Sequence, residues 1–208
     1  MPIRMDKASG REPVGLSFSS IDPSPPMLPP TDTLQFTLRP AVEADAGAIA
    51  LLANEVFRAT YGAAFTSEES LGRYIAERLS ESVVAGQIRE KRSDYILAEQ
   101  QGRLAGMASI LERDPPACIA SSAALELGRL YVRSEYHGRG VAHKLMRSTL
   151  DHAAERGADT LWLCVWDRNP RAIAFYRKWN FQEAGSKILM IDDVEFVDLL
   201  MKRRVKEA

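Results

Sequence analysis

The segment Leu130-Tyr-Val-Arg-Ser-Glu-Tyr-His-Gly-Arg-Gly-Val-Ala142 joins an expected strand, residues 124–132, to an expected amphipathic helix, residues 141–156. Gly138 and Gly140 allow a tight turn between them, because glycine has no Cβ. The first amides of a helix have no carbonyl partner within it, and with the helix dipole they attract anions. The segment therefore predicts a binding site for a diphosphate group, the alternative being a glycine-rich turn without a ligand.

Two common nucleotide-binding patterns do not fit this turn. The chain contains no G-x-x-x-x-G-K-[ST] string, so a P-loop is excluded. The dinucleotide pattern G-x-G-x-x-G requires a third glycine where His143 stands, and it usually opens its domain rather than lying past the middle of the chain. The anion expected here therefore belongs to another class of ligand.

A second segment, Val165-Trp-Asp-Arg-Asn-Pro-Arg-Ala-Ile-Ala-Phe-Tyr-Arg-Lys-Trp-Asn-Phe181, follows a mostly apolar strand expected over residues 160–166. Asn169 and Pro170 predict the start of a helix, with Asn as the N-cap and Pro at the first helical position. We expect this helix to end near Asn180, because asparagine tolerates the left-handed conformation.

The rest of the chain extends this pattern into one domain. Helices are expected over about residues 43–60 and 67–91, and strands over 34–39, 95–99, 104–111, 181–191 and 194–204. The resulting order, β-α-α-β-β-β-α-β-α-β-β, predicts a mixed α/β domain on a central sheet. Seven of the eleven prolines fall within residues 1–33. We therefore expect a flexible Pro-rich arm over 1–33 and the folded domain over 34–208.

Together these segments resemble the GNAT acyl-CoA N-acyltransferases. His137-Gly-Arg-Gly-Val-Ala142 is similar to motif A of that family, Q/R-x-x-G-x-G/A, with His137 in place of Gln or Arg. The second segment resembles motif B, N-x-x-A-x-x-F-Y-x-x-x-G-F, with Asn180 in place of the glycine. The resemblance implies a mostly antiparallel sheet of six to seven strands flanked by about four helices. Residues 124–132 and 161–176 look like those of bacterial spermidine/spermine acetyltransferases, which suggests a polyamine or another primary amine as acceptor.

The resemblance also implies the residues that bind the cofactor, acetyl-CoA. Backbone groups of the strand would pair with the pantetheine arm, and the glycine turn would hold the diphosphate. Asn169 would contact the pantetheine arm, the alternative being a plain N-cap. Lys178, with Lys144 and Arg171, would meet the ribose phosphate, the alternative being solvated surface side chains. The residues expected to bind acetyl-CoA are Leu130, Tyr131, Val132, His137, Gly138, Arg139, Gly140, Val141, Ala142, His143, Asn169, Ala172 and Lys178.

Two catalytic residues are expected from the same resemblance. Glu126 matches the spacing of the base in several family members, and strand alternation would put it on one face with Gly128, Leu130 and Val132. It would act through a water; the alternative is a solvent-exposed or salt-bridged strand glutamate. Tyr176 occupies the motif position of the general acid that protonates the departing thiolate; the alternative is an aromatic packing residue.

Composition excludes several other classes of protein. The 208 residues carry 27 Lys and Arg against 28 Asp and Glu, a formal charge of −1 that argues against nucleic-acid binding. No apolar run approaches the ~18 residues of a membrane span. Two cysteines and widely spaced histidines predict neither a disulfide scaffold nor a metal site. Composition therefore predicts a cytoplasmic protein without a metal. The family resemblance implies that it is an enzyme acting on a small-molecule amine, with a homodimer left open. The alternatives are an acetyltransferase for protein lysines or N-termini, and a non-catalytic CoA-binding module.

Overall fold

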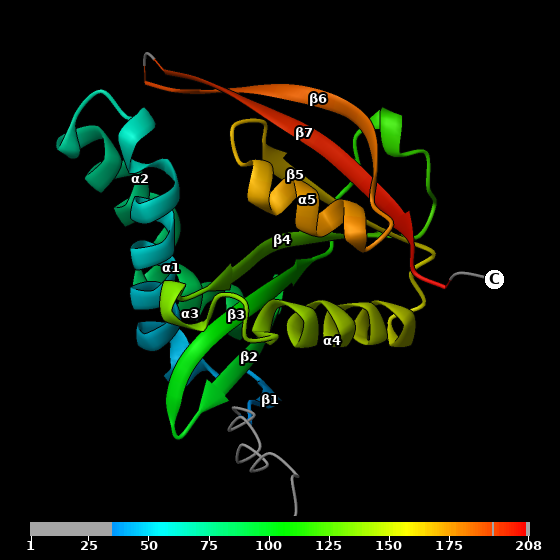
Figure 1. Ribbon diagram of the computed structural model, residues 1–208, viewed down its shortest axis with the longest axis horizontal. Helices are drawn as coiled ribbons and strands as arrows, with labels where there is room; N and C mark the ends of the chain where they lie inside the picture. Colours follow the sequence, from blue (N-terminus) through cyan, green and yellow to red (C-terminus); the bar gives the residue numbers. More distant parts are fainter. Residues whose placement is uncertain (1–34, 193, 207–208) are drawn as a thin grey trace, which may run out of the picture. The chain divides into compact units, whose positions relative to one another are not determined.

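A seven-stranded sheet in the order β1-β2-β3-β4-β5-β7-β6 runs through the domain (Figure 1). The computed structural model describes residues 35–192 and 194–206, so the arm predicted over residues 1–33 lies outside the described residues. The strands are β1 (Thr37–Pro40), β2 (Ser93–Gln100), β3 (Arg103–Leu111), β4 (Ala124–Val132), β5 (Thr160–Trp166), β6 (Gln182–Ile191) and β7 (Val194–Arg204). The mostly antiparallel sheet expected from the family resemblance is confirmed.

The one parallel contact in the sheet joins β4 to β5. These strands pair only where residues 124–126 face residues 160–162, although β4 continues to Val132 and β5 to Trp166. Beyond that point the two strands diverge (Figure 1). Backbone groups on the facing edges are therefore left without a strand partner, and they are available to an extended ligand.

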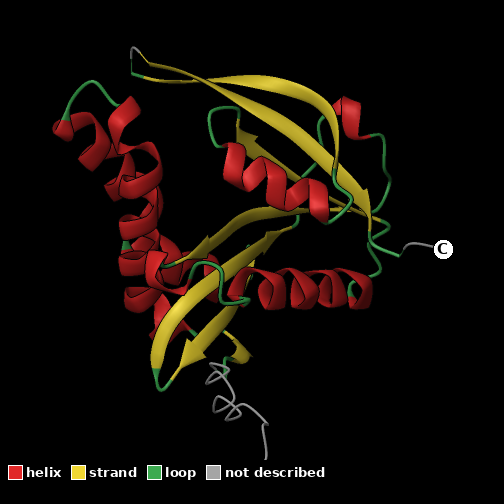
Figure 2. Cartoon of the chain, viewed as in Figure 1, coloured by secondary structure: helices red, strands yellow, loops and turns green. Residues whose placement is uncertain are grey.

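Helices cover both faces of the sheet (Figure 2). They are α1 (Ala46–Tyr61), α2 (Glu68–Leu79), α3 (Glu81–Arg89), α4 (Val141–Glu155) and α5 (Pro170–Lys178). One apolar core joins α4 and α5 to the sheet and includes the fully buried Leu145 and Leu161. A second core joins α1, α2 and α3 to β2 and β3 and includes Ile49 and Met107. No helix in the described part of the chain has both the length and the hydropathy that a membrane span requires.

The amphipathic helix expected after the glycine turn is α4. One face of it is buried, and its residues are Val141, Leu145, Met146, Thr149, Leu150 and Ala153. The single helix expected over about residues 67–91 is wrong, because Ser80 has an extended backbone and divides it into α2 and α3. Ser67 caps α2, its hydroxyl accepting a hydrogen bond from the Ser70 amide at 3.1 Å.

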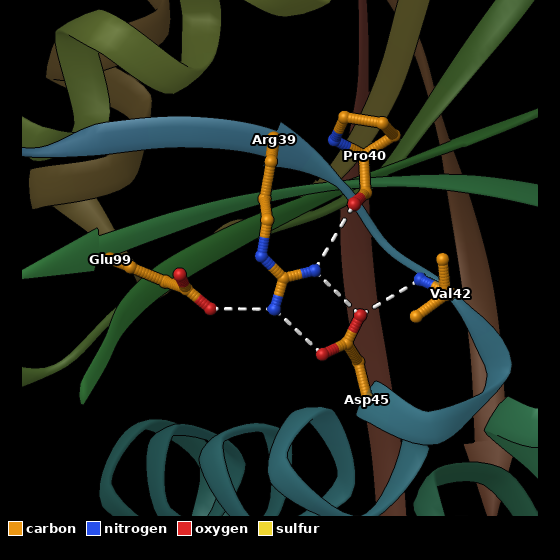
Figure 3. A network of polar contacts seen from close by, with 5 residues as sticks. All are labelled: Arg39, Pro40, Val42, Asp45 and Glu99. Carbon is orange, nitrogen blue, oxygen red and sulfur yellow. Dashed lines mark hydrogen bonds and ion pairs between the residues drawn. The ribbon is translucent and has the colours of Figure 1, made fainter. Parts of the chain in front are cut away.

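A network around Arg39 fixes the start of the described domain (Figure 3). The Arg39 guanidinium donates to both carboxylate oxygens of Asp45 and to Glu99 on β2, each at 2.7 Å. Asp45 also accepts a hydrogen bond from the Val42 amide at 2.8 Å. The network ties β1 to its neighbour β2 and to the turn that leads into α1.

The tip of the β6–β7 hairpin contacts α2. Arg73 donates to the Asp192 carboxylate at 2.7 Å, and the Ser70 hydroxyl donates to the same carboxylate. Aromatic rings form a second connection between these parts of the domain: Phe65 lies 5.5 Å from Phe196 on β7, measured between ring centroids. We call the Ser70–Arg73–Asp192 contact the hairpin clamp.

Candidate active site

A cavity of about 690 Å³ lies where β4 and β5 diverge. β4 forms one wall, the end of β5 with α5 forms another, and residues of α1 and the start of α4 complete the lining. The structure brings most of the predicted site residues together here: Leu130, Tyr131, Val132, His137, Gly138, Gly140, Val141, Ala142, His143, Asn169, Ala172 and Tyr176. The predicted Glu126, Arg139 and Lys178 are not among the residues that line this cavity.

A β-bulge at Gly128 shapes the β4 wall. Ser109 of β3 pairs with Arg129 and the next residue, Ile110, pairs with Leu127, so Gly128 is the extra residue. A Cβ at this position would lie 2.1 Å from a methyl group of Leu111, so a side chain there would require Leu111 to move. Gly128 therefore lets β4 bend at the point where the cavity begins.

The bulge corrects the face assignment that strand alternation suggested. Leu125 and Leu127 face the α4 core before the bulge, and Leu130 and Val132 face it afterwards. Glu126 therefore lies on the opposite face from Leu130 and Val132, contrary to the expectation. The extra residue shifts the alternation by one position.

The glycine turn and the first turn of α4 form one end of the cavity. Gly138 and Gly140 have φ values of 76° and 84°, in the left-handed region that glycine adopts without steric cost. Gly140 is the N-cap of α4, so the amides that follow it are free of intrahelical carbonyls and suit a diphosphate.

Substitution of Gly140 tests this turn. A Gly140→Val variant is expected to bind acetyl-CoA more weakly, because a non-glycine residue in the left-handed region costs roughly 1–2 kcal/mol. A Cβ added at this position would meet no heavy atom within 4 Å, so the effect would come from the backbone rather than from a clash. Titration calorimetry with CoA would measure it; unchanged affinity would contradict the assignment of the turn.

His137 stands where the family pattern has Gln or Arg, and the structure gives its side chain a defined position. Arg171 donates to its Nδ1 at 2.6 Å, and since guanidinium is only a donor, Nδ1 must accept. Nε2 then carries the hydrogen and donates to the Val132 carbonyl oxygen at 2.9 Å. The imidazole therefore connects the end of β4 to α5 across the mouth of the cavity.

Helix α5 places Asn169 and Tyr176 on the opposite wall. The Asn169 side-chain oxygen accepts a hydrogen bond from the Ala172 amide at 3.1 Å, which is the N-cap that the sequence predicted. Tyr176 is only 8% exposed and lines the cavity. Its ring packs edge-to-face on Phe181, which fixes its orientation.

The Tyr176 phenol is held in its protonated form. Burial raises the pKa of Tyr176 above its ordinary value of 10, and the nearby Tyr131 raises it further. Burial likewise raises the pKa of Tyr131 on the β4 wall. Both hydroxyls are therefore proton donors at neutral pH.

Glu126 is buried beside the cavity, with 6% of the residue exposed. One Arg113 nitrogen lies 3.2 Å from a Glu126 carboxylate oxygen, but the alignment is not that of a hydrogen bond. Burial raises the pKa of Glu126 above its ordinary value of 4.5, and this effect exceeds the opposite influence of Arg113 and Lys187. The carboxylate is thus shifted toward the neutral range that suits a proton acceptor.

Sequence reasoning did not single out Arg129 and Arg168, which line the cavity together with Cys164 and Arg171. Tyr61 and Trp166 also line it, and their ring centroids lie 5.2 Å apart. The apolar spacing at 125, 127, 130 and 132 contains the one available signal, since it shifts phase at Gly128. Among residues 35–192 and 194–206, no group of three or more His, Cys, Asp or Glu side chains could hold a metal ion.

The diverging strands, the amide-rich start of α4 and the buried phenol define a transferase that binds an acyl-CoA. Comparison with known proteins identifies the family: residues 55–181 match the model of the acetyltransferase (GNAT) family, and the chain belongs to it. It is an acetyl-CoA-dependent N-acetyltransferase.

The chain is similar to proteins from several organisms. It is 30% identical over 137 residues to an uncharacterized N-acetyltransferase of Mycobacterium tuberculosis, covering 66% of this chain and 83% of that one. The PaiA N-acetyltransferase of Thermoplasma acidophilum, in complex with coenzyme A, has a TM-score of 0.62 at 21% identity and covers 82% and 99% of the two chains. Mutant forms of the spermidine/spermine N-acetyltransferase of Vibrio cholerae give 0.59 at 20%, covering 82% and 94%. These structural likenesses establish the fold.

Proposed function

We propose that this N-acetyltransferase acetylates a small primary amine, with polyamines among the first acceptors to test. The hairpin clamp carries this proposal. It joins two segments on the acceptor side of the sheet, the β6–β7 tip and α2, through the Asp192 carboxylate. We place the acceptor entrance beside this connection, where a small molecule would pass more readily than a folded protein.

Tyr176 is proposed as the general acid. Acetyl-CoA supplies an acetyl group activated as a thioester, and transfer to an amine leaves a thiolate that needs a proton. The Tyr176 phenol is protonated at neutral pH and lines the cavity opposite Tyr131. Donation of its proton to the departing thiolate is general acid catalysis.

Glu126 is proposed as the base that takes a proton from the acceptor ammonium. Its carboxylate does not line the cavity, which supports transfer through an intervening water. Its register partner on β5 is Trp162, two residues before the cavity-lining Cys164, whose raised pKa includes a contribution from Glu126. The raised pKa of the buried Glu126 carboxyl suits the role.

An acceptor screen tests the proposed function. Thiol release from acetyl-CoA would be followed with polyamines, amino acids, aminoglycosides, a lysine-containing peptide and a folded protein. We expect turnover with one or more of the small amines and none with the folded protein. Turnover confined to peptide or protein acceptors would overturn the proposal.

Opening the hairpin clamp should change acceptor binding without changing cofactor binding. An Arg73→Ala variant removes the ion pair to Asp192, and we expect KM for the acceptor to rise several-fold because the hairpin tip is held less firmly. Steady-state kinetics against both substrates measures the effect, with the exposed Arg92→Ala as the control for losing a surface arginine. An equal rise in KM for acetyl-CoA would contradict a role confined to the acceptor side.

A further inference from the structure

Arg129 occupies a distinctive place in the cavity wall. It directly follows the Gly128 bulge on β4, and its register partner across the sheet is Ser109. With the alternation shifted by the bulge, Arg129 shares a face with Tyr131, which packs on the core of α1, α2 and α3. This is the face opposite Leu130 and Val132, which pack on the α4 side.

The guanidinium of Arg129 has no matching carboxylate. Among the described residues, no carboxylate oxygen lies within 4.0 Å of it, whereas Arg113 and Arg133 pair with Glu126 and Glu55. One Arg129 nitrogen donates to the Arg78 carbonyl oxygen, at a long 3.5 Å. Its other polar neighbours are the hydroxyls of Tyr95 and Tyr131, whose pKa values are raised by burial, an effect that Arg129 opposes. Arg129 also acts to lower the pKa of Glu126, although no Glu126 oxygen lies within ion-pair distance of it. A half-buried guanidinium with five donors is therefore only partly satisfied by the protein.

The diphosphate of acetyl-CoA is not a suitable counterion for Arg129. That group is expected at residues 138–143, where α4 begins, and α4 packs on the other face of β4. An anion that pairs with the Arg129 guanidinium must therefore lie on the face of β4 that carries Arg129 and Tyr131, where we expect the acceptor to bind. Lys187 lies near Glu126 and Asp198, so this region carries charges of both signs.

We propose that Arg129 binds a carboxylate of the acceptor, so that the preferred acceptors are amines that also carry a carboxylate, such as amino acids. This inference rests on the proposed acetylation of a small primary amine and narrows its acceptor. A planar guanidinium fits a carboxylate through two parallel hydrogen bonds, which also orients the molecule. With the carboxylate held at Arg129, the amine of the same molecule can be directed toward the cavity.

Matched acceptor pairs test this proposal. Each pair is an amino acid and the amine formed by its decarboxylation, for example phenylalanine with phenethylamine and lysine with cadaverine; spermidine is added as a polycation. The wild-type enzyme is expected to show the higher kcat/KM for the carboxylate-bearing member. Arg129→Met, which keeps the length of the side chain, should lower that value by about 10–100-fold and lower the value for the decarboxylated member much less.

Further variants separate recognition from structure. Arg129→Lys should restore part of the preference, because it keeps the charge but not the bidentate geometry. Arg92→Met, on an exposed arginine paired with Glu90, is the control. A wild-type preference for the decarboxylated amines or spermidine, or an equal loss with both members of a pair in Arg129→Met, would overturn the proposal.

Direct binding keeps the test independent of turnover. Calorimetry would measure binding of phenylalanine and phenethylamine to the enzyme saturated with CoA. Tighter binding of phenylalanine that disappears in Arg129→Met supports the role of Arg129, even if no acceptor in the screen is acetylated. The absence of acetylation would count against the proposed function alone. Equal binding of both compounds, or binding unaffected by the substitution, refutes the role of Arg129.

Discussion

Replacement of Tyr176 by phenylalanine is expected to lower kcat by about 10²-fold, the lower end of the range for general acid catalysis. The substitution removes only the hydroxyl. The ring that packs on Phe181 remains, so the wall of the cavity should keep its shape. KM for acetyl-CoA should therefore change little, and the loss should appear in kcat.

The control for this prediction is another buried tyrosine. Tyr95 is 3% exposed, and its hydroxyl donates to Gln87 at 2.6 Å outside the cavity. Tyr95→Phe loses the same atom and should retain activity. If Tyr176→Phe also keeps its kcat, Tyr176 is a packing residue, which is the alternative that its apolar helix allows.

The pH dependence gives a second test of Tyr176. Burial raises the pKa of Tyr176 above 10, so its phenol stays protonated across the neutral range. We expect no loss of kcat from deprotonation of this group below pH 10. A decline in kcat near neutral pH that disappears in Tyr176→Phe would contradict the assignment.

The parts of the molecule that sequence predicts well are those set by local pattern. Val141 to Ala153 form the buried face of α4 because apolar residues repeat with helical spacing, and Asn169 caps α5 because its side chain reaches an amide three residues later. Both segments also contain the two family motifs. Most of the residues correctly predicted to line the cavity belong to these motifs.

The features that sequence did not predict depend on contacts between distant residues. The Ser70 hydroxyl and the Asp192 carboxylate are 122 positions apart, and no local pattern relates them. The bulge at Gly128 moves Glu126 to the other face of β4 because the pairing with β3 skips one residue, which strict alternation cannot anticipate. Arg129 becomes a cavity residue for the same reason.

Glu126→Gln is expected to separate activity from stability. If Glu126 is the base, loss of its carboxylate should lower kcat/KM by about 10²-fold or more and remove the acidic limb of the pH profile. The pKa of Glu126 is raised in the folded protein, so its protonated form favours folding. That contribution to stability is complete below the ordinary pKa of 4.5 and is lost as pH rises through the higher folded value.

Where the pH exceeds the raised pKa of Glu126, its buried carboxylate is ionised and lowers the free energy of unfolding, and a neutral glutamine of the same size should relieve that cost. The ion pair lost with Arg113 offsets little, since the Arg113 side chain is 58% exposed. Denaturant unfolding at pH 7 should thus show Glu126→Gln to be as stable as the wild type or more stable, while its activity falls. A variant that loses stability and activity together would instead identify Glu126 as the structural counterion of Arg113. A structural counterion stabilises the fold, whereas a buried carboxylate that serves as a catalytic base lowers its stability.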